Sequence, residues 1–486
     1  MRIYLTSILI TTIILFFLSC DKKDSNSSFL MFGNNFQDIE SNEKYKDYEE
    51  NPFLESKKQP VSTFSVDADG ASYSNMRRYL NLGQLPPKGS VRIEEFLNYF
   101  TFDYQAPIDD ENMSINAEMA TCPWNDKNHI IRLGIKGKNI DKTELPNSNY
   151  VFLIDVSGSM NSPDKLGILK AGFITLVDNL KDGDKIAIVT YAGSSNVLLN
   201  STFATEKKKI KDAINALNAG GSTSGAEGIK TAYEIAQKNL IQHGNNRIII
   251  GSDGDFNVGP SSSEELIKLI ETQRDKGIYL TVLGVGQGNL NDHAMEQIAN
   301  NGNGNYEYID NAKQIQKVFV EELNKFYTIA KDTKIQIKFN PNKISSYRLI
   351  GYENRSLNIE DFEDNTKDAG EIGAGQTITA IYEVVLEDKN LNEQFAQFDV
   401  RYKKPNSENS IFIQHNITNN PKNIRDASEN MKFAAAVTGF GLLLKDSKYK
   451  GNINKTTITT LANDAVSFDP GGYRKEFLKL VQNMQK

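Results

Sequence analysis

The chain has 486 residues with 62 acidic and 55 basic side chains, so its formal net charge is −7. It is too long for a single hydrophobic core, and two or three domains are expected. No long run of Lys and Arg interleaved with aromatic residues occurs in the sequence, which argues against nucleic acid as a partner.

The first residues have the pattern of a secretory signal. Arg2 supplies a minimal positive region, and the apolar run from Leu5 to Leu18 is too short to span a membrane comfortably. The run ends in the segment from Phe17 to Cys20, which resembles a bacterial lipobox, although leucine is usual where Phe17 stands. The resemblance implies that residues 1–19 are a lipoprotein signal peptide and that Cys20 carries a lipid, which attaches the mature chain to a membrane. An uncleaved N-terminal anchor helix is the alternative.

The segment after the signal is polar up to about residue 60. Asp, Lys, Ser, Asn and Glu dominate residues 20–60, a composition typical of a disordered tether. Cys122 is the only cysteine besides Cys20, and no further metal ligands accompany it at short spacing. It is therefore predicted to be a small buried apolar residue.

Residues 61–147 are predicted to form an N-terminal domain of helices and strands. The expected elements are a strand at 63–69, helices at 71–82 and 91–100, and strands at 115–121 and 130–137. Asp67 and Asp69 end the first strand and could bind Ca²⁺, but the glycine and distal glutamate of a calcium loop do not follow at matching spacing. A structural role is therefore favoured for both carboxylates.

Strands and helices alternate over residues 148–328, at a spacing typical of a doubly wound parallel sheet. The predicted strands are 150–156, 185–191, 247–252, 278–285 and 306–309. The predicted helices are 163–180, 205–218, 225–241, 262–276, 291–300 and 311–328.

Three loops of this region carry oxygen-bearing side chains. One apolar strand ends in Asp155, followed by Ser157 and Ser159; a glycine-rich loop carries Thr223, and a second apolar strand ends in Asp253. Because the carboxyl ends of parallel strands meet at one edge of a sheet, these side chains are expected to lie together. Compact oxygen ligands suit Mg²⁺ better than a soft metal. Taken alone, the first loop is equally compatible with a Ser/Gly turn that caps a helix.

Asp155, Ser157, Ser159, Thr223 and Asp253 together resemble the metal-ion-dependent adhesion site of von Willebrand factor type A domains. In that family these positions converge on one Mg²⁺, and all of them are filled here in the family's order. The resemblance implies one Mg²⁺, with Mn²⁺ or Ca²⁺ as alternatives, and a partner protein whose Glu or Asp completes the coordination. It also implies an antiparallel edge strand near residues 197–199. Asp255 and Asn257 are expected to contact the metal ligands without binding the ion themselves.

The pattern changes after Lys331. Strands at 333–339, 377–386 and 397–403, joined by polar loops, indicate an antiparallel sheet. Because strands also precede the central region, this region is predicted to be inserted into a β-sandwich built from both flanks. The last part is predicted to be a buried helix at 427–444 and an amphipathic helix at 473–484. The C-terminal domain, 329–486, is thus expected to be β-rich with helices at its end.

The sequence outside the metal motif resembles bacterial lipoproteins that carry a central von Willebrand A domain between a dedicated N-terminal domain and a family-specific C-terminal domain. The segments that carry this resemblance are VDADGASYSNMRRYL, CPWN, GDFNVG, IGYENR, DAGEIGAG and FAAAVTGFGLLL. The implied fold is α/β: a doubly wound, mostly parallel, Rossmann-like sheet flanked by a β-rich domain with C-terminal helices. The implied location is the bacterial cell envelope, at the outer membrane or its periplasmic face.

Three classes of function fit these observations unequally. A metal-dependent protein-binding module for adhesion or scaffolding is favoured. A structural envelope protein whose metal only stabilises loops stays open as an alternative, because both kinds of site use the same ligands. A phosphoryl-transfer enzyme is disfavoured, because Ser157 stands where such an enzyme has a second Asp and the four histidines form no catalytic constellation. No catalytic residue is predicted, and the glycine-rich segment 284–288 lacks the spacing of a nucleotide loop.

Overall fold

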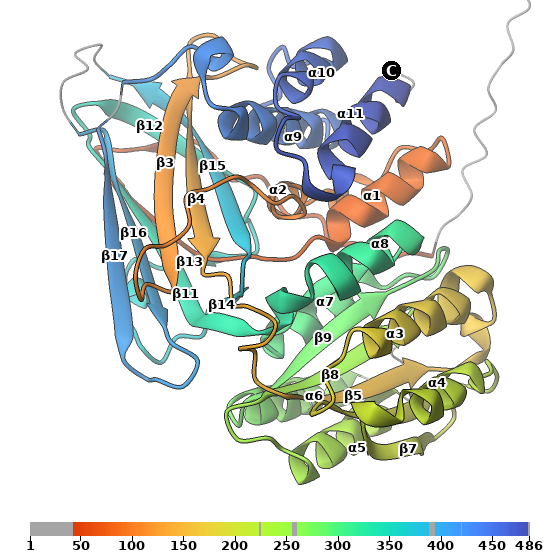
Figure 1. Ribbon diagram of the computed structural model, residues 1–486. Helices are drawn as coiled ribbons and strands as arrows, with labels where there is room; N and C mark the ends of the chain where they lie inside the picture. The colour runs from red at the N-terminus through yellow and green to blue at the C-terminus, as the bar shows by residue number, and fades with distance from the viewer. Residues whose placement is uncertain (1–41, 223–224, 255–259, 388–393, 419, 485–486) are drawn as a thin grey trace, which may run out of the picture. The chain divides into compact units, whose positions relative to one another are not determined.

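A doubly wound sheet forms the central part of the chain in this computed structural model (Figure 1). The structure describes residues 42–486 apart from 223–224, 255–259, 388–393, 419 and 485–486. The sheet order is β10-β9-β8-β5-β6-β7, and every pairing is parallel except that of the edge strand β7. The strands are β5 (Ser148–Asp155), β6 (Lys185–Tyr191), β7 (Ser195–Phe203), β8 (Asn245–Ser252), β9 (Ile278–Gly284) and β10 (Tyr306–Tyr308).

Helices cover both faces of this sheet, which confirms the doubly wound prediction. Phe152 of β5 packs in one core with α3 (Ile168–Asp178), α4 (Lys207–Asn215) and α8 (Ala312–Gln316). Leu153 points to the other face, towards α5 (Gly225–Lys238), α6 (Pro260–Arg274) and α7 (Asp292–Asn301). Alternate residues of β5 thus enter opposite cores, and all of β5 is buried, as its continuous apolar run predicts. The antiparallel edge strand expected near residues 197–199 is β7.

Two antiparallel sheets form a sandwich from both flanks of the central sheet. One sheet contains β2 (Val61–Ser65), β11 (Thr328–Phe339), β13 (Ser356–Leu357), β14 (Gly370–Gly373), β16 (Ala396–Lys403) and β17 (Ser410–Ile417). The other contains β1 (Leu54–Glu55), β3 (Met113–Thr121), β4 (His129–Gly137), β12 (Ile344–Ile350) and β15 (Thr377–Leu386). Because β2 pairs with β11 and β4 with β15, the strands before and after the central region share one core, as predicted.

Helices from the two flanks form a separate core beside the sandwich (Figure 1). They are α1 (Ala71–Asn81), α2 (Ile93–Asn98), α9 (Glu429–Leu444), α10 (Lys455–Asn463) and α11 (Tyr473–Asn483). Cys122 is buried in this core as a free thiol, as expected of a small apolar residue. Residues 61–147 and 329–486 therefore interleave in two shared cores rather than forming two separate domains. Single helical turns lie at Lys88–Ser90, Gly158–Met160, Pro163–Gly167, Ala204–Glu206, Lys317–Glu321, Leu323–Phe326, Glu360–Phe362, Ile424–Asp426 and Pro470–Gly472.

The second half of the expected tether is packed on the fold. Glu43 forms an ion pair with Arg78 of α1, and β1 pairs with β12. Polar composition suggested a solvated segment here, but Glu43 has a largely buried partner in Arg78 that composition alone does not reveal. The first half, residues 20–41, lies outside the described residues together with the predicted signal peptide and Cys20. In the part of the chain that is described, no helix is both long and apolar enough to cross a membrane.

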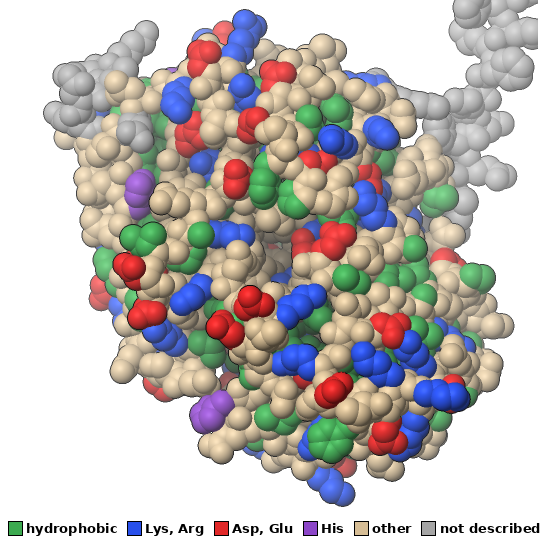
Figure 2. All heavy atoms as spheres, in the orientation of Figure 1, with side chains coloured by type: hydrophobic (Ala, Val, Ile, Leu, Met, Phe, Trp, Pro, Cys, Tyr) green, Lys and Arg blue, Asp and Glu red, His purple; other side chains and the backbone are tan. Residues whose placement is uncertain are grey.

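Asp69 joins the N-terminal flank to the central sheet, and Asp67 pairs with an arginine next to β13 of the sandwich. Arg355 donates a hydrogen bond to Asp67 over 2.9 Å, and the backbone N–H of Tyr306 donates to Asp69 over 2.9 Å. These contacts agree with the structural role favoured for both carboxylates. Figure 2 shows acidic and basic side chains interspersed over the visible face, without a large basic area.

Candidate functional site

The predicted metal ligands gather at the carboxyl edge of the central sheet. Asp155 is the last residue of β5, and Asp253 directly follows the neighbouring strand β8. Both carboxylates are buried, as is Ser157, whereas Ser159 is exposed. The cluster therefore extends from the end of the buried sheet to the protein surface.

Hydrogen bonds hold the Asp155 carboxylate in one orientation. The backbone N–H of Ser157 donates to Oδ1 over 2.9 Å, and the hydroxyl of Ser252 donates to Oδ2 over 2.9 Å. The hydroxyl oxygens of Ser157 and Ser159 lie 3.0 Å apart. The three motif residues thus bring their oxygens together within one short loop.

The glycine-rich loop lies beside this motif. Gly158 donates its N–H to the carbonyl of Gly221 over 3.0 Å, and Gly220 donates to the carbonyl of Val156 over 2.7 Å. These bonds fix the chain two residues before Thr223. Thr223 itself lies outside the described residues, as do Asp255 and Asn257.

The electrostatics of the site favour a bound cation. Burial raises the pKa of Asp155, and the charge of Asp253 raises it further, against the hydrogen bonds from Ser157. Burial also raises the pKa of Tyr191 at the end of β6 well above its ordinary value, and the Asp155 charge adds to this effect. A buried carboxylate whose charge is destabilised by a neighbouring carboxylate, together with two adjacent hydroxyls, suits a hard divalent cation. The described residues hold no group of three or more His, Cys, Asp and Glu side chains placed to bind a metal.

Lys165 and Asn289 contact this site and were not predicted from the sequence. The Lys165 ammonium lies 2.9 Å from Oδ2 of Asp253, and the amide of Asn289 donates to the same oxygen over 3.0 Å. Lys165 also donates to Oδ1 of Asn289 over 2.7 Å. Lys165 belongs to the helical turn Pro163–Gly167. Asn289 follows the glycine-rich segment 284–288, which lacks the spacing of a nucleotide loop. The one signal in the sequence is that each residue lies in the loop region that follows an apolar strand, β5 for Lys165 and β9 for Asn289.

The N-terminal segment Asn42–Tyr45 holds the loop that carries Asn289. Asn42 donates its N–H to the carbonyl of Gly288 over 3.0 Å, and Lys44 donates to that of Leu290 over 2.8 Å. The N–H of Gly288 in turn donates to the Glu43 carboxylate over 2.7 Å. The segment therefore restrains the residues on both sides of Asn289.

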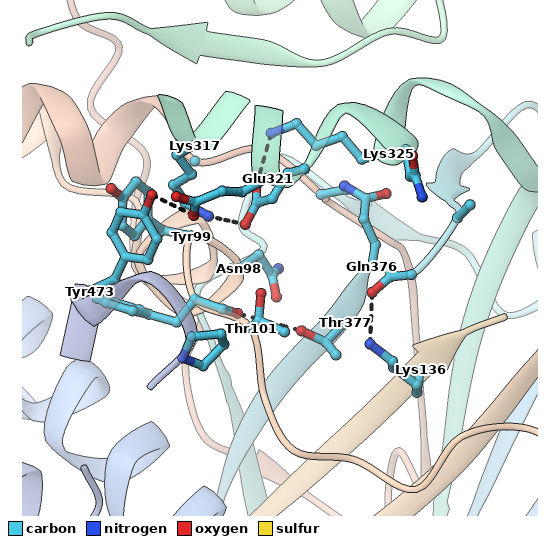
Figure 3. Close-up of a pocket in the computed structure, with 18 of the residues that line it drawn as sticks. Asn98, Tyr99, Thr101, Lys136, Lys317, Glu321, Lys325, Gln376, Thr377 and Tyr473 are labelled. Atoms are coloured by element: carbon cyan, nitrogen blue, oxygen red, sulfur yellow. Dashed lines mark hydrogen bonds and ion pairs between the residues drawn. The ribbon is translucent and has the colours of Figure 1, made fainter. Parts of the chain in front are cut away.

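A cavity of about 280 Å³ lies away from this edge, between the central region, the sandwich and the C-terminal helices (Figure 3). Several of its charged groups have partners: Lys317 pairs with Glu322, Lys325 with Glu307, and the Tyr473 hydroxyl donates to Glu321 over 2.8 Å. Lys136 instead donates to the Gly375 carbonyl over 2.8 Å. Such mutual pairing is typical of a polar junction between parts of a fold. It offers no nucleophile activated by a neighbouring base among the described residues that line it.

Comparison with known families divides the chain in the same way. The von Willebrand factor type A domain matches residues 149–321, and a family described as von Willebrand factor matches residues 39–132. The C-terminal family of the uncharacterized protein YfbK matches residues 324–486. The central match spans the doubly wound sheet, and the N- and C-terminal matches lie on either side of it.

Several relatives and solved structures are similar to parts or most of the chain. The uncharacterized protein YfbK of Escherichia coli (strain K12) is 38% identical over 467 residues, which cover 90% of this chain and 80% of that protein. A UPF0353 protein of Mycobacterium sp. (strain KMS) is 29% identical over 28% of this chain and 44% of its own. A von Willebrand factor type A structure from Catenulispora acidiphila has 15% identity and a TM-score of 0.44, covering 79% of this chain and 91% of that one. The chain belongs to the bacterial von Willebrand factor type A family of YfbK, in which specific N- and C-terminal regions flank the central domain.

Proposed function

We propose that the chain binds a partner protein through one divalent cation, Mg²⁺ in the first place, at the carboxyl edge of the central sheet. A von Willebrand factor type A domain suggests a protein-interaction or scaffold role. The finer proposal is that Asp155, Ser157, Ser159, Thr223 and Asp253 hold the ion and that a partner Glu or Asp completes its coordination.

The geometry around Asp155 supports this proposal most directly. Its carboxylate is fixed by Ser157 and Ser252, and the two motif hydroxyls lie 3.0 Å apart next to it. Bound there, the ion would supply an electrophilic centre for an acidic group from outside. Neutral hydroxyl ligands leave much of the positive charge of the ion uncompensated, and the exposure of Ser159 gives a partner access.

The hydroxyl ligands provide a clean test of the metal site. Ser159→Ala and Thr223→Ala should each weaken Mg²⁺ binding at least about tenfold in titration calorimetry, because each removes one ligand and no charge. Thr175→Ala is the matched control, since that hydroxyl only bonds the Ala171 carbonyl of its own helix. Unchanged Mg²⁺ affinity in both ligand variants would contradict the site. Weakened affinity with intact binding of partners crosslinked in cells would instead favour the structural function, in which the ion only stabilises loops.

We also propose that the chain is anchored in the bacterial cell envelope through a lipid on Cys20. The proposal rests on the apolar run from Leu5 to Leu18 and on the lipobox-like segment that ends at Cys20. Cys20→Ala should release the protein from the membrane fraction or leave it unprocessed, and should abolish labelling with radioactive palmitate. Cys122→Ala is the control, because that thiol is buried in the helical core. Persistent labelling of the Cys20 variant would refute lipid attachment at this residue.

A further inference from the structure

We propose that Lys165 is a built-in competitor for the divalent cation: its ammonium shares the Asp253 carboxylate with the ion and thereby lowers the affinity of the site. This inference rests on the proposed metal site and adds a residue that sets its strength. It concerns a side chain outside the predicted ligand set.

The contacts of Lys165 show that its position is fixed. Its ammonium lies 2.9 Å from Asp253 and 2.7 Å from the side-chain oxygen of Asn289, and its side chain is 11% exposed. Asn289 also donates to Asp253, so the three side chains form a closed triangle of hydrogen bonds. A lysine that only solvated its charge would extend from the surface instead.

The loop after β9 is shaped to let this lysine pass. Gly286 has a φ of +74°, and a Cβ at this position would lie 2.4 Å from Cγ of Lys165. The carbonyl of Gly286 accepts a hydrogen bond from the Tyr308 hydroxyl at 2.6 Å, and Val285 donates its N–H to the Ser252 carbonyl at 3.1 Å. Only glycine combines this backbone conformation with the space that the Lys165 stem fills.

The consequence for a bound ion follows from charge. A divalent cation that uses Asp253 must share its negative charge with an ammonium already in contact with it, or displace that ammonium. Sharing the carboxylate costs free energy, because two positive charges a few ångströms apart repel strongly. Displacing the ammonium costs free energy, because it breaks the contacts of Lys165 with Asp253 and Asn289. The wild-type site is therefore expected to bind its ion more weakly than the same ligands would without Lys165.

Lys165→Met tests this inference, since methionine keeps most of the apolar stem and removes the charge. Titration calorimetry with Mg²⁺ and with Mn²⁺ should show binding at least about tenfold tighter than in the wild type. Lys170→Met is the matched control and should leave both affinities unchanged, because the Lys170 ammonium bonds only the carbonyls of Asn215 and Leu217. Equal or weaker affinity in a folded Lys165→Met protein would overturn the inference.

Thermal melts give a second readout. In EDTA the Lys165→Met protein should melt below the wild type, because Asp253 loses its buried counter-ion. Saturating Mg²⁺ should raise the melting temperature of the variant more than that of the wild type, since tighter binding stabilises more. If the methionine variant does not fold, Lys165→Gln, which keeps a hydrogen-bond donor, should show the same tightening. An equal Mg²⁺-induced rise in the variant and the wild type would count against competition.

Asp155→Ala separates the failure of this inference from the failure of the proposed function. Mg²⁺ binding that Asp155→Ala removes but Lys165→Met leaves unchanged would overturn only the role of Lys165. Binding that appears only in the Lys165→Met protein, and is lost again with Asp155→Ala, would support competition in its strongest form. No Asp155-dependent binding in either background would overturn both proposals.

Discussion

Arg77→Met is expected to lower the free energy of unfolding by about 3–5 kcal/mol at pH 7, because it leaves a buried carboxylate without its partner. Arg77 of α1 binds Asp310 through two hydrogen bonds of 2.8 and 2.6 Å, and both side chains are almost fully buried. Its guanidinium also donates to Glu476 of α11 over 2.6 Å. The Arg77 side chain thus connects α1 of the N-terminal flank and α11 of the C-terminal flank to the segment that follows β10.

Urea denaturation measures the effect of Arg77→Met. Arg425→Met is the control, since that side chain is exposed, and it should change the stability by less than about 0.5 kcal/mol. Adding Asp310→Asn to Arg77→Met should recover part of the loss, because an amide carries no buried charge. A loss below about 1 kcal/mol for the single variant would show that the ion pair contributes little to holding these parts together.

Glu43→Gln is the second change with a large expected effect, about 2 kcal/mol of stability at pH 7. Burial alone would raise the pKa of Glu43, but Arg78, Tyr45 and Tyr79 hydrogen-bond the carboxylate and lower its pKa from 4.5 to about 2. The expected loss is smaller than this whole shift in pKa implies, because solvent screens part of the site. Hydrogen exchange should also show faster exchange of the Gly288 amide, which donates to Glu43.

The stability difference between Glu43→Gln and the wild type should depend on pH. A carboxylate with a lowered folded-state pKa stabilises the fold fully above its unfolded value of 4.5, and this contribution is lost as the pH falls towards 2. Urea titrations at pH 7, 5, 4 and 3 should therefore show the difference shrinking below pH 4.5. Glu55→Gln is the control, because Glu55 only forms an exposed pair with Lys58. A difference that persists undiminished at pH 3 would indicate a loss of packing instead of a loss of charge.

The sequence predicted the centre of the site because its signals are local. The apolar run before Asp155 specifies a strand buried on both faces, and the alternation of strands and helices places its carboxyl end beside that of β8. Few hydroxyl and carboxylate side chains lie at these strand ends, so the candidate ligands could be identified from the sequence. Asp155, Ser157, Ser159 and Asp253 all lie at the predicted edge.

The contacts of Lys165 and Glu43 could not be predicted in the same way. Each joins residues more than thirty positions apart through one pair of charges, and a Lys or Glu on a polar stretch is usually solvated. Periodicity and turn residues carry no information about such pairs. The shared sandwich was predictable in outline from strands on both flanks, whereas the register of β2 against β11 required the structure.

The attachment of Asn42–Tyr45 beside the loop of Asn289 has a mechanical consequence. Tension applied from the N-terminal side would be borne first by the Glu43–Arg78 pair and by the backbone hydrogen bonds to Gly288 and Leu290. The strands of the sandwich come later along this path, because β1 begins only at Leu54. A pulling force would therefore act on α1 and on the loop next to Asp253 before it reached the strands of the sandwich.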